Sequence, residues 1–209
     1  MGLGSTPHRL LRAAEQLMAE NGIAGTSVRQ ITDVAEANIA SVNYYFGSKN
    51  ALLLELLKDR FARLDAELLA RVSSVVDKAA GEIPSIADLT DAYFDALAHL
   101  GYNTEAGQLD PFILLIQRVD SEQRDTLKQA QDFQAPGITR LLTLLSAPLG
   151  EEDRKAVDAW VLVGLMFTAS VAAMPLMARD GSGNKQVLAI RGYIAAGVAA
   201  YIQHLRSDI

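Results

Sequence analysis

The sequence predicts an all-α protein with a small N-terminal helical domain and a larger C-terminal helical domain. Alanine and leucine are abundant, aromatic residues make up 6% of the chain, and β-branched residues do not cluster as they do in strands. Apolar residues recur at helical spacing, and glycine or proline separates the periodic segments. A chain of 209 residues can bury a substantial core, and its 50% apolar content argues against disorder.

The first predicted helix follows a short leader at residues 1–6. Pro7 suits its first turn, and Asn21-Gly22 ends it. Its apolar face is formed by Leu10, Ala14, Leu17 and Met18. We expect this helix to support the segment that follows it.

Residues 26–49 predict two short helices and the start of a third. Thr26 is the predicted N-cap of the first helix. Four residues at helical spacing form its apolar face: Val28, Ile31, Val34 and Ala35. A second helix is expected over residues 39–46, with Val42 turned inward. Gly47 ends that helix, and Ser48 caps the next one.

This order of elements is that of a helix-turn-helix unit, which lays its second helix in the major groove of DNA. Ser41 and Asn43 can form hydrogen bonds with base edges, whereas tyrosine hydroxyls and helix N-termini suit phosphates. Short amphipathic helix pairs are also common in all-helical proteins. The spacing alone therefore leaves DNA binding and a structural role both open.

Specific residues add a family resemblance. The run from Leu10 to Leu57 resembles the N-terminal domain of TetR-type transcriptional repressors, and the pattern Tyr-x-Phe-x-x-Lys-x-x-Leu at residues 44–52 is its most specific part. The resemblance implies a homodimer that binds a double-stranded, palindromic operator. It also implies that a small molecule entering the C-terminal domain releases the DNA.

The resemblance assigns base contacts mainly to Ser41 and Asn43. It assigns contacts with the DNA backbone mainly to Thr26, Ser27, Arg29, Asn38, Tyr44, Tyr45 and Lys49. Two residues depart from the usual pattern, because Ile39 stands where lysine is frequent and Asn43 where tyrosine is frequent. The first change removes a phosphate contact or adds contact with a thymine methyl group, and the second favours base reading.

The net charge of −6 is divided unevenly. Residues 1–64 hold 7 Lys or Arg and 6 Asp or Glu, about +1, which leaves 12 basic and 19 acidic residues, about −7, for positions 65–209. An N-terminal domain with so few cations must rely on helix N-termini, hydroxyl groups and a second subunit for its contacts with phosphates. We therefore predict modest affinity for random DNA.

The remaining chain predicts a long helix from Ser48 to Val76, broken at residues 81–84, and a helix capped by Ser85 whose inward stripe leaves Phe94 outside. A loop is expected over residues 101–107. Pro111 opens a helix at 112–119, and another is predicted over 121–145 with an interruption at 135–137.

Residues 159–178 carry no charge and match a membrane span in length. We reject that reading because Pro175 lies inside the segment and no basic cluster flanks it. An all-apolar helix can instead be buried by a partner subunit. The final helix, residues 187–201, is rich in small residues, so we expect these last two helices to form a homodimer interface.

No catalytic motif, metal-ligand spacing or cofactor loop is recognisable. Asp91, Asp95 and His99 share a helix face, but a solvated face explains them better than a metal. The chain has no cysteine and no recognisable signal peptide, which favours the cytoplasm. A pocket for a small apolar effector is predicted among Phe94, Phe112, Phe133, Phe167, Met174 and Met177.

Together these observations predict a non-enzymatic, ligand-responsive repressor. Residues 1–47 would form the DNA-binding domain, and residues 48–209 the effector-binding and dimerisation domain. Three alternatives stay open: an activator, a ligand-independent DNA-binding protein, and a helical dimeric scaffold whose head binds protein.

Overall fold

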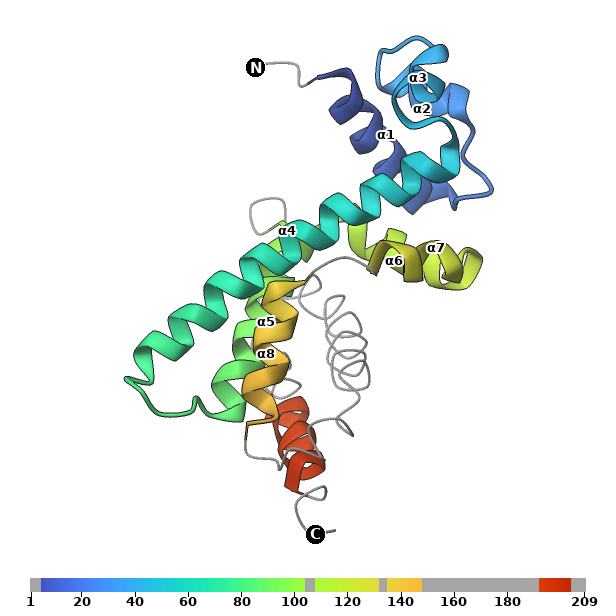
Figure 1. Ribbon diagram of the computed structural model, residues 1–209. Coiled ribbons are helices and arrows are strands. Elements are labelled where there is room, and N and C mark those ends of the chain that lie inside the picture. Colours follow the sequence, from blue (N-terminus) through green and yellow to red (C-terminus); the bar gives the residue numbers. More distant parts are fainter. Residues whose placement is uncertain (1–4, 104–107, 132–134, 148–191, 204–209) are drawn as a thin grey trace. The chain divides into compact units, whose positions relative to one another are not determined.

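The computed structural model describes residues 5–103, 108–131, 135–147 and 192–203 (Figure 1). The chain divides into two compact units. Unit 1 comprises Met1–Arg63 and Asp110–Gln134, and unit 2 comprises Leu64–Leu109 and Ala135–Ile209. Helices account for almost all of the regular structure in the described ranges, which confirms the all-α class. These units are defined by packing, so the functional boundary after residue 47 stays a prediction.

Unit 1 is a bundle of short helices together with the first half of one long helix. Its helices are α1 Thr6–Asn21, α2 Val28–Val34, α3 Ala40–Phe46, the start of α4 Lys49–Lys78, α6 Pro111–Glu122 and α7 Arg124–Gln131. Residues from α1 to α4 and from α6 are buried together, among them Leu10, Met18, Ile31, Val42, Leu53, Leu57, Ile113 and Ile116. The core therefore brings α6 to the three helices of the head.

The signals that end and begin helices are mostly where the sequence predicts them. Gly22 and Gly47 adopt φ values of 80° and 81° at the ends of α1 and α3. The Ser48 hydroxyl accepts a hydrogen bond from the Ala51 N–H at 3.1 Å, and the Ser85 hydroxyl accepts one from the Asp88 N–H at 3.1 Å. These caps fix the entry to α4 and α5.

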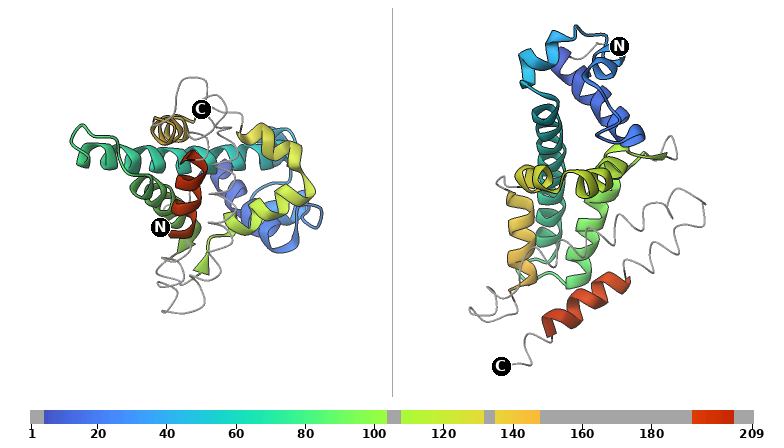
Figure 2. Two further views of the ribbon diagram at one scale, coloured as in Figure 1. Left: turned by 90° about the horizontal axis from the view of Figure 1, so that it is seen from below. Right: turned by 90° about the vertical axis from the view of Figure 1, so that its right-hand side faces the viewer.

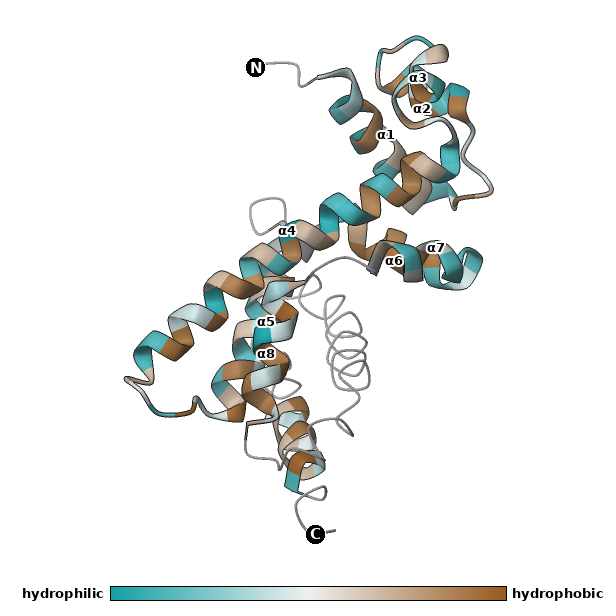
Figure 3. Cartoon of the chain, in the orientation of Figure 1, coloured by the Kyte–Doolittle hydropathy of each residue, from teal (hydrophilic) through white to brown (hydrophobic). Residues whose placement is uncertain are grey.

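α4 is one unbroken helix (Figure 2). Its 30 residues span about 45 Å at 1.5 Å per residue. Apolar and polar residues both occur along its whole length (Figure 3), and buried apolar residues recur every three or four positions, as in an amphipathic helix. It ends before Ala80 and Gly81, whose φ values of 50° and 98° turn the chain. The predicted long helix and its break are therefore confirmed.

Unit 2 packs three helices with the second half of α4. They are α5 Ile86–Gly101, α8 Pro136–Leu145 and a helix over residues 192–203. The buried Asp65 carboxylate of α4 accepts hydrogen bonds from the N–H groups of Gly137, at 3.0 Å, and Ile138, at 2.9 Å. A Cβ atom on Gly137 would lie 2.4 Å from the Asp65 carbonyl oxygen, so only glycine fits at this second position of α8.

The structure corrects several expectations. Ser27, not Thr26, is the N-cap of α2. Val34, the last residue of α2, is 55% exposed, whereas Phe94 is buried within unit 2, where α5 contacts α8. The helix expected from residue 121 is divided, since α6 continues to Glu122 and the backbone breaks at Gln123.

A short pair of strands replaces part of the expected loop after α5. β1 Tyr102–Asn103 pairs antiparallel with β2 Gln108–Leu109. Within the described ranges, no helix is long and apolar enough to cross a membrane. The segments 159–178 and 187–191, on which the membrane and part of the dimer predictions depend, lie outside those ranges.

Candidate nucleic-acid interface

α2 is held at its start by a reciprocal capping box. The Ser27 hydroxyl accepts a hydrogen bond from the Gln30 N–H at 3.2 Å, and the Gln30 side chain accepts one from the Ser27 N–H at 2.8 Å. Thr26, one residue earlier, is buried, and its hydroxyl donates toward the carbonyl oxygens of Leu17 and Gly22. Thr26 therefore fastens the loop between α1 and α2 instead of capping α2.

The turn between α2 and α3 contains a residue in the left-handed region. Glu36 has a φ of 49°, a conformation that favours glycine. The Arg9 side chain of α1 supports this turn, because its Nε donates to the Ala35 carbonyl oxygen at 2.9 Å. The Asn38 side-chain oxygen then accepts a hydrogen bond from the Ala40 N–H at 2.9 Å, which caps α3.

The outer surface of α3 combines polar, aromatic and apolar side chains. We call it the α3 face and define it as Ile39, Ser41, Asn43, Tyr44 and Tyr45. Tyr44 is 81% exposed and meets Tyr45 edge to face, with ring centroids 4.8 Å apart. In the described part of the chain, the side chains of Ser41, Asn43, Tyr44 and Tyr45 form no hydrogen bond.

Lys49 behaves differently from the other predicted DNA contacts. Its ammonium group donates to the carbonyl oxygens of Ile23, at 2.9 Å, and Thr26, at 2.8 Å. Ser27 and Gln30 likewise bond to each other. Three predicted contacts with DNA, Thr26, Ser27 and Lys49, are thus engaged in holding α2 in place, which their spacing in the sequence did not indicate.

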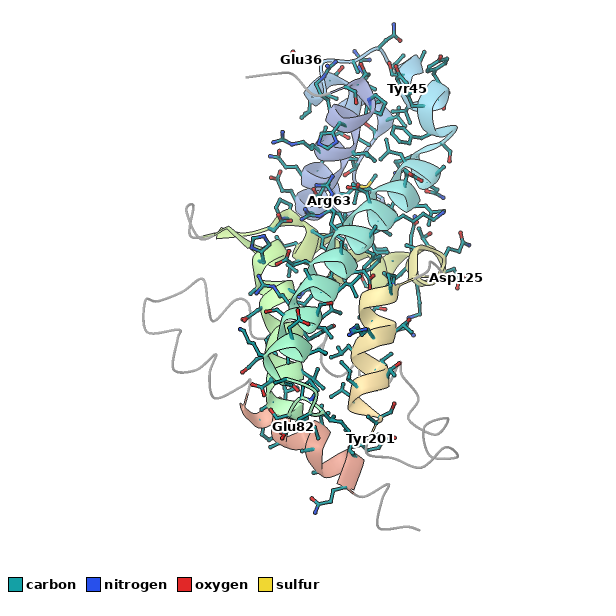
Figure 4. All side chains as sticks on the ribbon, turned by 60° about the vertical axis from the view of Figure 1, so that its left-hand side comes forward. Glu36, Tyr45, Arg63, Glu82, Asp125 and Tyr201 are labelled. Carbon is teal, nitrogen blue, oxygen red and sulfur yellow. The ribbon has the colours of Figure 1, made fainter. Side chains whose placement is uncertain are left out.

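Arg29 is the one cation of α2. Its side chain is 83% exposed, and its Nε lies 3.9 Å from Asp33, one helical turn away. An exposed pair at that separation contributes little to stability. The guanidinium is therefore available to an anion, although Asp33 and Glu36 reduce the positive charge around it. Glu36 and Tyr45 lie at one end of unit 1, away from Arg63 (Figure 4).

A second polar cluster lies where α1, α4 and α6 meet. We call it the α1–α6 junction and define it as Glu15, Arg60, Asp110, Arg118 and Glu122. The Arg60 guanidinium pairs with Glu15 and Asp110, and it also lies 4.8 Å from the centre of the Phe112 ring. Sequence reasoning missed this cluster because its members are up to 107 positions apart, from Glu15 to Glu122.

Glu15 is the strained member of the junction. Its Oε1 lies 2.9 Å from Arg60 Nε, but the pair lacks hydrogen-bond geometry, so this buried oxygen has no hydrogen-bond partner. Burial raises the pKa of Glu15 from 4.5 to about 6, and the attraction of Arg60 offsets only part of that rise. The carboxylate is therefore held in its charged form at a cost above that pH.

The C-terminal half of α6 clasps the end of α1. Arg118 donates from Nε and Nη2 toward the carbonyl oxygens of Ala19 and Glu20, each at 3.4 Å. One turn later, Glu122 accepts hydrogen bonds from the N–H groups of Ile23, at 3.1 Å, and Ala24, at 3.2 Å. A cation thus meets the negative end of α1, and an anion meets the N–H groups that follow it.

The predicted effector residues divide between the units. Phe94 is buried in unit 2, whereas Phe112 is buried in unit 1 against Phe61, with ring centroids 5.7 Å apart. Phe133, Phe167, Met174 and Met177 lie outside the described residues. A hollow of about 350 Å³ in unit 2 has a mixed lining of charged residues, such as Arg71, Lys78 and Asp88, and apolar residues, such as Val75, Pro84 and Ala92. An apolar effector cavity stays a prediction.

The fold and the α3 face together define a helix-turn-helix protein, and similarity to known proteins agrees. Residues 10–56 match the model of the bacterial regulatory proteins, tetR family. The chain is 28% identical over 117 residues to the probable HTH-type transcriptional regulator YttP of Bacillus subtilis (strain 168), covering 56% of this chain and 53% of that protein. It is 36% identical over 90 residues to the HTH-type transcriptional repressor KstR2 of Mycobacterium tuberculosis (strain CDC 1551 / Oshkosh), 43% of each.

The chain thus spans about half the length of the curated relatives it matches. Solved structures extend the likeness in fold. A TetR transcriptional regulator from Legionella pneumophila is 20% identical with a TM-score of 0.59, covering 94% of this chain and 99% of that one. The fatty acid degradation regulator FadR from Bacillus halodurans is 15% identical with a TM-score of 0.61, covering 93% and 96%. Residues 10–56 thus match the helix-turn-helix domain of the tetR family of bacterial regulatory proteins.

Proposed function

We propose that this protein is a ligand-responsive transcriptional repressor that binds a palindromic operator as a homodimer. The observation that carries the proposal is the α3 face, on which Ile39, Asn43, Tyr44 and Tyr45 are exposed and Ser41 is half-buried. Its polar side chains form no hydrogen bond within the described residues, and it stands on a helix-turn-helix that matches the tetR family model. Leaving such groups unpaired suits a surface whose partner is another molecule. The curated relatives named repressors support repression over activation.

Different parts of the head would meet different parts of the DNA. Ser41 and Asn43 would face base edges, while Tyr44, Tyr45 and Arg29 would meet phosphates. Asn38 keeps its amide N–H groups for phosphate, since its oxygen caps α3. Thr26, Ser27 and Lys49 would act through the fold by setting the orientation of α2.

The homodimer proposal is supported by the helix over residues 192–203. Ile194, Val198 and Ile202 are buried on one side, whereas Tyr193 is 82% exposed. Cβ atoms built on Gly192 and Gly197 would meet no atom within 4 Å, so a second helix backbone can approach there. Tyr193→Asp should shift the protein toward monomer in sedimentation, while Ile83→Asp, an exposed apolar residue outside this helix, should not.

One binding experiment tests the regulator itself. The full chain is titrated onto duplex DNA that flanks its own gene and onto random duplex, at several salt concentrations, with and without small apolar compounds. We expect tighter binding to one flanking site and release by some compound. Equal binding to both DNAs would overturn the specific-regulator proposal, and binding that no compound changes would overturn ligand response.

Arg29→Ala supplies an internal check on phosphate contact. It should weaken binding to all duplexes and lower the slope of log affinity against log salt by about 1 per subunit. Arg124→Ala is the matched control, because Arg124 also forms an exposed pair one helical turn from an aspartate. Equal effects of the two substitutions would show that Arg29 makes no specific contact.

A further inference from the structure

An apolar side chain stands exposed at the start of α3. Ile39 directly precedes Ala40, the first residue of α3, with helical φ and ψ of −56° and −30°, and it is 58% exposed. Asn43 follows four residues later, so both side chains lie on the same side of the helix, with Cβ atoms about 5–6 Å apart. Two chemically different groups, a branched alkyl chain and an amide, are thus presented together.

The major groove offers one partner for each of these groups. The apolar group that the bases present in the major groove is the C5-methyl of thymine. Adenine presents there an N7 acceptor and an N6 donor, which match the donor and acceptor of an amide. We propose that Ile39 and Asn43 together select A·T pairs in each half-site. Ile39 contacts a thymine methyl group, and Asn43 forms a bidentate pair with an adenine. This inference rests on the DNA-binding function proposed above.

The neighbouring residues leave this discrimination to Ile39 and Asn43. The side-chain oxygen of Asn38 accepts the hydrogen bond that caps α3, so the Asn38 amide cannot form a bidentate contact with a base. A serine hydroxyl such as that of Ser41 pairs with several bases and separates them poorly. Tyr44 and Tyr45 contact each other through their rings. Base pairs stack about 3.4 Å apart, so the two readers would address the same or adjacent pairs.

The test uses the full chain and chemically edited DNA. An operator is first selected from a random duplex pool. Each thymine is then replaced by deoxyuridine, which removes only the methyl group, and each adenine by 7-deazaadenine, which removes only the N7 acceptor. Affinities are measured for the wild type, Ile39→Ala, Asn43→Ala and the control Val34→Ala. Val34 is also exposed and apolar but lies on α2, beside a hollow lined by Arg9 and Arg12.

We expect one thymine per half-site at which deoxyuridine weakens wild-type binding about threefold to fivefold, the effect of losing one buried methyl group. That loss should vanish in Ile39→Ala and persist in Val34→Ala. One 7-deazaadenine should weaken wild-type binding about tenfold and leave Asn43→Ala unchanged. Asn43→Ala should accordingly lower discrimination among sequences more than overall affinity.

The two levels of the proposal fail separately. If selection yields no preferred sequence, the DNA-binding function itself is overturned. If an operator is selected but every deoxyuridine leaves affinity within twofold, or the loss persists in Ile39→Ala, the role of Ile39 is overturned. If every 7-deazaadenine leaves affinity within twofold, or the loss persists in Asn43→Ala, the role of Asn43 is overturned.

Discussion

On the α3 face of unit 1, Asn43 and Tyr44 are exposed, and their polar groups form no hydrogen bond within the described residues. At the α1–α6 junction of the same unit, Arg60, Arg118 and Glu122 are each engaged with another helix or loop. Polar groups that are already paired stabilise the fold, whereas unpaired ones on the surface are free to bind a ligand. Substitutions in the two regions should therefore have opposite effects on stability and on binding.

The largest difference in stability between the two regions is expected for substitution of Arg60. Arg60→Ala leaves two partly buried carboxylates without their cation and removes the contact with Phe112, so we expect a loss of about 3 kcal/mol in the free energy of unfolding by urea. Asn43→Ala on the α3 face should change it by less than about 0.5 kcal/mol. Arg63→Ala is the matched control, since its pair with Asp59 is exposed and contributes about 0.5 kcal/mol or less. A smaller loss for Arg60 than for Arg63 would contradict the comparison.

The pH dependence of unfolding should also come from the junction. Because the folded-state pKa of Glu15 is raised to about 6, the folded protein binds this proton more tightly than the unfolded chain. The resulting stability is fully present below about pH 4.5 and is lost as the pH rises through 6, on the order of 2 kcal/mol.

Glu15→Gln removes this titration. The difference in unfolding free energy between variant and wild type should therefore change with pH between 4.5 and 6, in the direction that favours the variant at the higher pH. Glu20→Gln, on the same helix and exposed, should track the wild type. Parallel pH curves for Glu15→Gln and wild type would show that Glu15 does not titrate in this range.

The two regions also differ in how far the sequence predicts them. The α3 face follows from local signals: Gly47 ends α3, Ser48 caps α4, and the helical period leaves Asn43 and Tyr44 exposed and Ser41 half-buried. The junction does not, because Arg118 and Glu122 meet α1 across nearly a hundred positions, and no spacing in one sequence reveals such a pairing.

Errors within the local reading have physical causes as well. Thr26 and Ser27 are both good N-caps, and the choice falls on Ser27 because the Thr26 hydroxyl finds carbonyl acceptors in the core. Lys49 was predicted to contact a phosphate, but its long side chain donates hydrogen bonds to two carbonyl oxygens of the same domain. Tertiary contacts thus changed the roles of residues whose helix positions were predicted well.

The clasp on α1 should have a moderate effect on stability. Glu122→Ala leaves the N–H groups of Ile23 and Ala24 without their acceptor, so we expect a loss of about 1 kcal/mol. Glu122→Gln keeps one acceptor oxygen and should restore much of it. Hydrogen exchange of the two amides gives a direct readout, and Asp120→Ala, in an exposed pair with Arg124, is the control. Unchanged exchange in Glu122→Ala would mean that the clasp does not hold this loop.

Glu36 should show the smallest effect and belongs to both sides of the comparison. Its φ of 49° is unfavourable for a residue with a Cβ atom, so Glu36→Gly should raise the free energy of unfolding by about 0.5–1 kcal/mol after the entropy of glycine is counted. Glu36→Ala keeps the unfavourable φ and should not stabilise the fold. Both substitutions remove a negative charge near the α3 face, so both should tighten DNA binding similarly. If the free energy of unfolding rose equally in the two variants, backbone strain at Glu36 would not be the cause of the rise. If only the glycine variant bound DNA more tightly, the flexibility of the turn, and not the lost charge, would govern the affinity for DNA.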